Sequence, residues 1–191
     1  SASSGHRWAG PGSSYPLPRP GSYTADQYVS TLARPSRGQG RSVSLTTGAA
    51  RQLVNVVWHK QSDLRLHDHE PLSRAHLQKS KLPVLHLHVF DNFWFGRTRI
   101  GGFEKTGDLR ASFWIDCVED LRSSLEARGQ HLCVRFGISA AQALRELSEC
   151  LDIAKVFTYA EVCQEELDIE AELEAVLKEI TRGAGQIERC W

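Results

Sequence analysis

Two histidines, His86 and His88, stand two residues apart within the apolar run LPVLHLHVF. Side chains at this spacing in a strand point to the same face, so the two imidazoles could hold one metal ion. The sequence places no carboxylate or cysteine at a compelling third position. We therefore favour two stacked imidazoles near the sheet surface, each with its hydrogen bonds satisfied, over a metal site at this pair.

A charged loop, Asp63–Asp68, follows the first predicted strand. In open α/β sheets, ligands bind beyond the carboxyl ends of the strands, so this loop could line a ligand site. The alternative is a structural turn in which Arg65 pairs with a carboxylate from elsewhere in the domain, a common arrangement in folded proteins. Of the two, the structural turn is the favoured interpretation.

Lys105, Thr106 and Gly107 precede a predicted helix, where free backbone N–H groups attract anions. A phosphate site is one interpretation. The glycine-rich order of a P-loop is missing, so a turn that caps the helix is favoured. The sequence also lacks a nucleophile elbow, a G-x-G-x-x-G fingerprint and an H-E-x-x-H motif, and it therefore points to no catalytic group.

Short β-branched, apolar runs alternate with amphipathic segments from residue 53 onward. Such runs predict buried parallel strands, and the segments between them have the spacing of helices. The alternation predicts an α/β fold, with a Rossmann-like parallel sheet of about five strands and helices on both faces. The predicted strands span 53–58, 82–90, 132–136, 155–159 and 186–191, and the predicted helices span 71–78, 108–128, 139–150 and 164–182.

Individual residues mark the ends of the predicted helices. Asp68 and Ser139 are the predicted N-caps of two of them, because short polar side chains accept hydrogen bonds from free backbone N–H groups. Gly129 and Gly183 are predicted to end two others. Leu151 is assigned to the inward face of the helix that begins at Ser139.

Residues 1–52 are rich in Gly, Ser, Pro and Arg and have no helical or strand period. The segment cannot build a core of its own, and its composition resembles a transit peptide or what remains after its cleavage. We expect an extended arm, ahead of a domain spanning 53–191, that lies on partner protein subunits. Aromatic side chains carry much of the binding energy of interfaces, and the predicted anchors are Trp8, Tyr15, Tyr23, Tyr28 and Leu32.

Charge and cysteine content narrow the possible functions. The 23 Lys and Arg residues balance 23 Asp and Glu residues, so no overall basic field attracts nucleic acid. The five cysteines are widely spaced and form no C-x-x-C, which favours reduced thiols in a reducing compartment over a disulfide framework or a zinc ribbon. No apolar run approaches about 18 residues, so no membrane span is expected.

Two segments carry a family resemblance. Phe103–Phe113 reads F-x-K-T-G-x-x-R-A-x-F, and Asp120–Gly129 follows as D-L-R-x-x-L-x-x-x-G. These pair with Asp63–Leu72, which reads DLRLHDHEPL. Together they resemble the N-terminal antenna domain of the photolyase/cryptochrome family, and they are most similar to its DASH branch. The resemblance implies an α/β fold, in agreement with the fold predicted from the strand and helix pattern.

The resemblance also implies where the family's chemistry resides. The family's FAD and substrate groove belong to a larger helical domain, which these 191 residues do not include. No catalytic residue is therefore expected in the chain, and a non-enzymatic role is favoured over an enzymatic one. FAD is expected only if a longer chain exists.

The folate-binding members of the family contact a pterin antenna through a polar pair directly after an E-V step. In this chain the resemblance carries that site onto Glu161, Cys163 and Gln164. The chain departs from the family pattern at His59–Ser62, which is one residue longer, and at His69, where the family has Asn. It departs again at Cys163, which is a poor substitute for an amide side chain. These departures imply a vestigial antenna site. No cofactor is expected in this chain, with a folate or pterin antenna as the alternative.

Two functions follow as hypotheses. In the first, the chain is a non-catalytic structural or interaction subunit of an organellar assembly, photosynthetic or respiratory. Its location would be the chloroplast rather than the mitochondrion, in soluble or peripheral form. In the second, the chain is the N-terminal portion of a DASH cryptochrome or DNA photolyase, acting as a blue-light, FAD-dependent photoreceptor or repair enzyme. Nucleic acid is an expected partner only in the second case.

Overall fold

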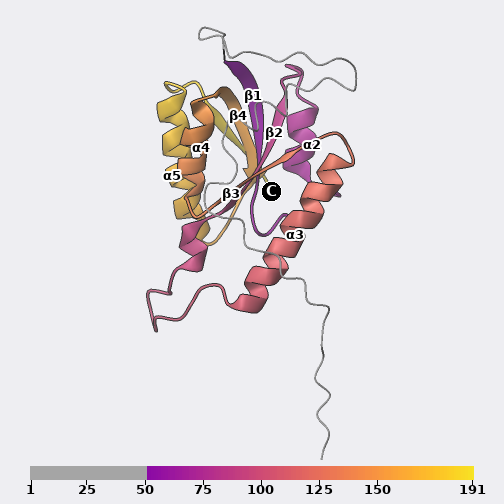
Figure 1. Cartoon of the computed structure of the whole chain (residues 1–191). Helices are drawn as coiled ribbons and strands as arrows, with labels where there is room; N and C mark the ends of the chain where they lie inside the picture. The colour runs from indigo at the N-terminus through magenta and orange to yellow at the C-terminus, as the bar shows by residue number, and fades with distance from the viewer. Residues whose placement is uncertain (1–50) are drawn as a thin grey trace, which may run out of the picture.

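The computed structural model describes residues 51–191 (Figure 1). The five predicted anchors of the arm fall within residues 1–50, outside the described residues. The first strand, β1, begins at Gln52, where the composition of the sequence changes.

The described chain forms a five-stranded sheet in which every neighbouring pair is parallel. The strand order is β3-β2-β1-β4-β5, so the chain builds the sheet outward from β1 in both directions. The predicted α/β fold with a parallel sheet is confirmed. The strands are β1 (Gln52–His59), β2 (Val84–Phe90), β3 (Leu132–Phe136), β4 (Leu151–Tyr159) and β5 (Gln186–Cys190).

Helices cover both faces of this sheet (Figure 1). α2 (Glu70–His76) and α3 (Asp108–Glu126) lie on one face, and α4 (Ala140–Ser148) and α5 (Gln164–Ile180) lie on the other. A short 3₁₀ helix, η1 (Asn92–Phe95), follows β2. Crossovers between parallel strands are nearly always right-handed, so the side on which the next strand joins the sheet decides which face the connecting helix covers.

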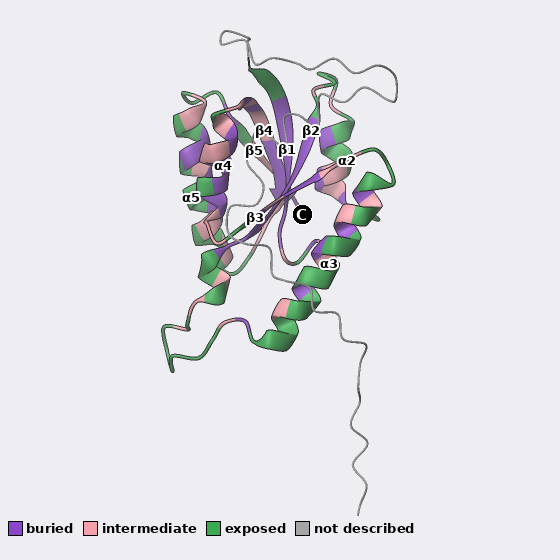
Figure 2. Cartoon of the chain, viewed as in Figure 1, coloured by how far each residue is buried: buried purple, intermediate pink, exposed green. Residues whose placement is uncertain are grey.

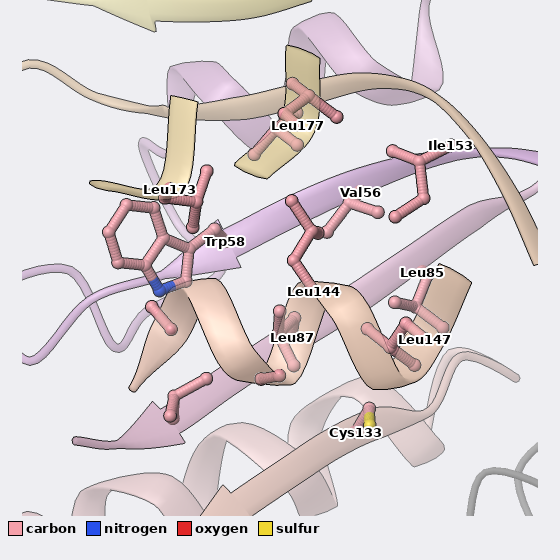
Figure 3. Packing of buried hydrophobic residues seen from close by; sticks show 14 of the residues in the cluster. Val56, Trp58, Leu85, Leu87, Cys133, Leu144, Leu147, Ile153, Leu173 and Leu177 are labelled. Atoms are coloured by element: carbon pink, nitrogen blue, oxygen red, sulfur yellow. The ribbon is translucent and has the colours of Figure 1, made fainter. Parts of the chain in front are cut away.

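The side chains of β2 alternate between the two faces, although all seven residues of the strand are buried. Leu85, Leu87 and Val89 pack with α4 and α5 in the larger core cluster (Figure 3). Val84 and Phe90 pack toward α2 and α3. The helices present buried sides to the sheet and exposed sides to solvent (Figure 2). Each fully buried leucine contributes roughly 1.5–3 kcal/mol of hydrophobic free energy.

Two sequence predictions about element ends are wrong. The N-cap of α2 is His69, whose Nδ1 accepts a hydrogen bond from the Leu72 N–H, and not Asp68. Asp68 instead has φ 51°, a left-handed conformation that Asp tolerates in turns. Leu151 belongs to β4 and not to the preceding helix, because the strand pairs with β1 from its first residue, opposite Gln52.

Other predicted ends agree with the structure. Ser139 caps α4 and accepts from the Gln142 N–H. Gly129 and Gly183 follow α3 and α5 with φ of 71° and 86°, a conformation that costs glycine little and lets the chain close the helix. The edge strand β5 forms where predicted.

The segment between η1 and α3 exposes several large apolar side chains. Arg97 and Glu104 form an antiparallel bridge that folds the segment back on itself. Ile100 and Phe103 extend from this turn, and Leu109 and Phe113 follow on the first turns of α3; Leu109 is 89% exposed and Phe103 is 73% exposed. We call these four residues the Phe103 surface. Large apolar side chains exposed to this degree are candidate contacts for a partner.

The expectations about the cysteines and about a membrane span can be compared with the described residues. All five cysteines are free thiols, of which only Cys163 is exposed. No helix in residues 51–191 is long and apolar enough to cross a bilayer.

Candidate functional site

The strand order reverses between β1 and β4, and a cavity lies at that point. β1 leads to α2 on one face, whereas β4 leads to α5 on the other, so the two connections diverge beyond the carboxyl ends of the strands. The cavity encloses about 510 Å³ of atom-free space, its open mouth included. It is lined by Trp58, Lys60, Gln61, Ser62, Val89, Asp91, Trp94, Trp114, Ala140, Glu161, Glu166 and Ile169.

Three indole rings line the cavity, from the end of β1 (Trp58), from η1 (Trp94) and from α3 (Trp114). The Trp114 ring is fixed on two sides. Its Nε1–H donates to Nε2 of His88 at 3.0 Å, and Phe95 stacks on it with a centroid distance of 5.5 Å and an interplanar angle of 9°. The cavity therefore has flat, oriented aromatic walls.

The hydrogen bond from Trp114 also fixes the state of His88. Because indole N–H can only donate, Nε2 of His88 must be the acceptor and Nδ1 carries the proton. Nδ1 then donates to the backbone oxygen of His59 at 2.8 Å. Burial lowers the pKa of His88 to about 4, so the ring is neutral at pH 7.

A buried cation, the ammonium of Lys60, is among the groups that line the cavity. The Lys60 ammonium, on a side chain that is 8% exposed, donates to the Tyr159 backbone oxygen at 2.8 Å and to the carboxylate of Glu170. Glu170, 2% exposed, also accepts from Nε of Arg189 at 2.8 Å. These contacts tie the end of β1 to α5 and β5. Burying both charges is tolerated only because they pair.

Two carboxylates stand at the rim of the cavity. Glu161 lies 3.5 Å from the Lys60 ammonium and accepts from the Ser62 hydroxyl at 3.2 Å. Glu166 is half-buried and makes no hydrogen bond or ion pair with the other described residues. An unpaired carboxylate beside aromatic walls offers an acceptor for the N–H groups of a ligand.

Asp91 lines the same cavity but is fully used by the fold. One carboxylate oxygen accepts from the Phe93 N–H at 2.9 Å, and the other accepts from the Ala140 N–H at 3.0 Å. It thereby caps η1 and joins the end of β2 to the start of α4. Its role is structural.

The structure brings only one of the three antenna-site residues suggested by the sequence to this cavity. Glu161 lines it. Cys163 is the exposed N-cap of α5 and makes no side-chain capping bond. Gln164 is exposed and donates to Asp168 at 2.7 Å. Trp58 and Lys60 were not predicted as cavity residues, although their position at the carboxyl end of the first strand is one where ligands bind in open α/β sheets.

The loop Asp63–Asp68 is a structural turn, but its arginine does not pair with a carboxylate as predicted. The Arg65 guanidinium contacts the Asp68 backbone oxygen at 3.3 Å and lies over the Tyr159 ring, 5.4 Å from its centroid. The Tyr159 hydroxyl in turn donates to the same Asp68 oxygen at 3.2 Å. The aromatic ring replaces the expected acidic partner. Gln61 and Ser62, just before the loop, line the cavity, and the loop itself does not.

Lys105–Gly107 forms the turn before α3, in line with the favoured interpretation. Gly107 is the N-cap of the helix. The Lys105 ammonium lies 3.0 Å from a Glu165 oxygen and 3.2 Å from the centroid of the Phe93 ring. A lysine with these two partners already has its charge compensated.

His86 and His88 are buried and each has partners of its own, as expected for satisfied imidazoles. The predicted stacking is wrong, because His86 contacts the rings of His59 and His76 whereas His88 contacts those of Phe90 and Trp114, and both lie deeper than the sheet surface. His86 Nδ1 is 3.2 Å from His59 Nε2, and its Nε2 is 3.3 Å from His76 Nε2. Burial is the largest cause that lowers the pKa of His86 to about 3, with the neighbouring His76 adding to it. Burial, followed by His86, holds the pKa of His59 well below its usual value.

This chain matches a known protein family. The model of the DNA photolyase family matches residues 55–187, which include every strand end that lines the cavity. The chain belongs to the DNA photolyase family. The resemblance to the N-terminal α/β domain of that family is thereby confirmed.

Relatives within the DNA photolyase family include DASH cryptochromes. The chain is 43% identical over 122 residues to "Cryptochrome DASH" of Gloeobacter violaceus, covering 64% of this chain and 23% of that protein. It is 37% identical over 139 residues to "Blue-light photoreceptor PHR2" of Arabidopsis thaliana, covering 73% of this chain and 30% of that protein. The chain thus spans less than a third of the length of these relatives.

Solved structures of the family share the fold. The cryptochrome of Synechocystis sp. PCC6803 superposes with a TM-score of 0.65 and 34% identity, over 73% of this chain and 27% of that one. An archaeal photolyase from Sulfolobus tokodaii superposes with a TM-score of 0.56 at 18% identity, over 71% of this chain and 29% of that one, which shows the fold alone.

The buried Lys60–Glu170 pair generates a stability prediction. Glu170→Gln leaves the Lys60 ammonium buried without its main counter-charge, so the free energy of unfolding should fall by about 3–5 kcal/mol in urea denaturation. Glu174→Gln, at a more exposed position that also binds Arg189, is the matched control and should cost at most about 1 kcal/mol. Equal costs for the two variants would contradict the importance given to the buried pair.

Proposed function

We propose that the chain serves as a non-catalytic, antenna-type domain that holds a flat pterin-like heterocycle in the tryptophan-lined cavity. The observation that carries this proposal is the position of three indoles and two rim carboxylates at the point where the strand order reverses. In open α/β sheets this is the usual place for a ligand.

The walls suit a planar aromatic ring. Aromatic pairs prefer stacked or edge-to-face contact, and each such pair adds about 0.5–1.5 kcal/mol beyond the area it buries. Trp114 is held in one orientation by His88 and Phe95, so binding a ring against it need not order it first. Preorganisation of this kind increases affinity.

The carboxylates of Glu161 and Glu166 at the rim would favour one kind of flat heterocycle over another. A pterin carries adjacent N–H donors along one edge, which a carboxylate can accept as a bidentate partner. A flavin ring presents carbonyl acceptors on both sides of a single N–H, and these would face the negative charge of Glu161 and Glu166 unfavourably. Glu166 has no partner among the described residues and Glu161 is only partly neutralised by Lys60. The acidic rim therefore favours a pterin over a flavin.

The names of the relatives indicate in which compartment of the cell such a domain would act. They include DASH cryptochromes of plants named as chloroplastic or mitochondrial. An organellar location is accordingly part of this proposal. Light-driven activity of the kind that the names of the relatives suggest would need the remainder of a photoreceptor or photolyase, on the same chain or on a partner.

Ligand titration tests the cavity directly. Folic acid, used as the pterin probe, should quench the tryptophan fluorescence of the purified chain and saturate at one equivalent. Trp94→Ala should weaken binding about tenfold through the lost stacking, and Glu166→Gln should weaken it tenfold or more through the lost charged acceptor. Riboflavin should bind more weakly than folic acid.

The control for this titration is Gln164→Ala, on the exposed start of α5. It should leave folic acid binding unchanged, because Gln164 does not line the cavity. Absence of binding would overturn the proposal. Binding that depends on Gln164 and not on Trp94 would return the site to the residues that the family pattern implies.

A second candidate function, a structural or interaction subunit of a larger organellar assembly, is favoured by the Phe103 surface. Ile100, Phe103, Leu109 and Phe113 are largely exposed, and a partner that covered them would remove large apolar groups from water. In this proposal, partner subunits cover the Phe103 surface, and the arm at residues 1–52 adds contacts through its aromatic residues.

Assembly in the source organism tests this candidate. The tagged chain should co-sediment with a particle much larger than a monomer in native extract. Deletion of residues 1–45, or the double change Leu109→Ser and Phe113→Ser, should shift it to the monomer fraction while circular dichroism stays unchanged. The matched control changes Leu77 to Ser, an exposed leucine at the end of α2 outside the Phe103 surface. Normal assembly of both altered chains would contradict the subunit role.

A further inference from the structure

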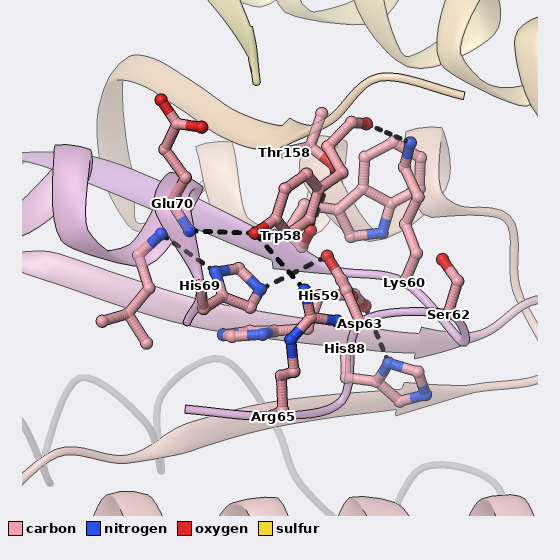
Figure 4. Close-up of polar contacts among 12 residues, drawn as sticks. Trp58, His59, Lys60, Ser62, Asp63, Arg65, His69, Glu70, His88 and Thr158 are labelled. Atoms are coloured by element: carbon pink, nitrogen blue, oxygen red, sulfur yellow. Dashed lines mark hydrogen bonds and ion pairs between the residues drawn. The ribbon is translucent and has the colours of Figure 1, made fainter. Parts of the chain in front are cut away.

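Three buried side chains meet beside the end of β1, and each turns at least one polar atom without a hydrogen-bond partner toward the others. His59 ends β1, Asp63 lies in the following loop, and His69 caps α2 (Figure 4). All three are 3% exposed or less. Their ligand-type atoms lie within 4.8 Å of one another, and they form the group in residues 51–191 that could hold a metal ion.

The polar atoms that face one another in this group lack hydrogen-bond partners. Nδ1 of His59, both carboxylate oxygens of Asp63 and Nε2 of His69 are buried and unsatisfied among the described residues. Native proteins satisfy nearly all such atoms, and an exception calls for a bound ion or water. Nε2 of His69 comes within 3.3 Å of an Asp63 oxygen, longer than the 2.7–2.9 Å typical of a charge-assisted hydrogen bond.

We propose that His59, Asp63 and His69 form a binding site for one divalent transition-metal ion. Two imidazole nitrogens and one carboxylate oxygen match zinc and its first-row neighbours, whereas Mg²⁺ and Ca²⁺ prefer all-oxygen sites. Three protein ligands leave a fourth position for water. This site is separate from the cavity, since none of the three residues lines it.

The three ligand atoms need to move only slightly closer together to bind one metal ion. Ligands of one tetrahedral zinc lie about 3.3 Å apart, given metal–ligand bonds of about 2.0–2.1 Å. The His69–Asp63 distance already has this value. The remaining distances are 4.8 Å or less, so the His59 ring must approach by at most about 1.5 Å.

The surroundings of His59 suit a metal ligand. Its second nitrogen, Nε2, lies 3.2 Å from Nδ1 of His86, which in turn lies 3.3 Å through Nε2 from His76. A metal on Nδ1 leaves the proton on Nε2, where His86 can accept it. Metal-bound histidines regularly donate their other ring N–H in this way, which orients the ring and strengthens the ligand.

Metal binding to His69 would break a hydrogen bond of the helix cap, and that loss can be observed. Its Nδ1 accepts from the Leu72 N–H at 3.1 Å, so the neutral ring without metal carries its proton on Nε2. Binding a metal through Nε2 moves that proton to Nδ1, which can then no longer accept. The cap on Leu72 and the metal therefore exclude each other. α2 keeps its first backbone bond, from the Ser73 N–H to the His69 oxygen.

Titration of the metal-free chain with Zn²⁺ and Co²⁺ tests the site. One equivalent should bind, Co²⁺ should develop the visible absorption of a tetrahedral nitrogen and oxygen site, and the melting temperature should rise with metal concentration. The Leu72 amide resonance should shift on binding. His59→Phe, Asp63→Asn and His69→Asn should each weaken binding at least about tenfold.

The variants are chosen to fold. Phe keeps an aromatic ring at position 59, Asn keeps the shape at position 63, and Asn at position 69 remains a good N-cap. His67→Ala removes an exposed histidine of the same loop and should leave binding unchanged. No metal binding to the folded chain overturns the proposal. So does binding that survives all three changes, or a Leu72 resonance that stays fixed while metal binds.

Discussion

The buried pairing of Lys60 with Glu170 is the constraint on which the carboxyl edge of the sheet depends. Both side chains are almost fully buried, and neither charge could remain there unpaired. The pair fixes α5 against the end of β1, and Arg189 extends it to β5. β1 and β4 send their connections to opposite faces, and the pair lies where these connections diverge. Lys60 also lines the cavity at that point.

Polar side chains at this edge divide into those that hold the fold and those that remain available. Asp91 satisfies two backbone N–H groups and Arg65 is occupied by the loop backbone and Tyr159, so neither is free to bind a ligand. Glu166 has no such partner among the described residues. The acidic rim and the indole walls together account for the preference we propose for a pterin. The orphaned His59, Asp63 and His69 belong to a separate group on the α2 side of β1.

Most of the fold could be predicted from the sequence because short local sequence patterns determine its strands and helix ends. The β-branched runs gave the strands, Ser139 and Gly129 marked helix ends, and the alternation gave a parallel sheet. Asp68 was the wrong cap because a histidine nitrogen three residues before Leu72 also accepts a backbone N–H. The site was largely missed because it depends on contacts such as Lys60 to Glu170, which lie 110 residues apart. Only Glu161 was common to the predicted antenna site and the cavity.

A crystal structure of the chain with a bound pterin would decide whether the tryptophan-lined cavity holds a flat heterocycle. The ring should lie against the indoles of Trp58, Trp94 and Trp114, with its N–H edge directed at Glu166 or Glu161. A pterin bound instead on the exposed face at Cys163 and Gln164, or a cavity without ligand in crystals saturated with it, would rule out the proposed site.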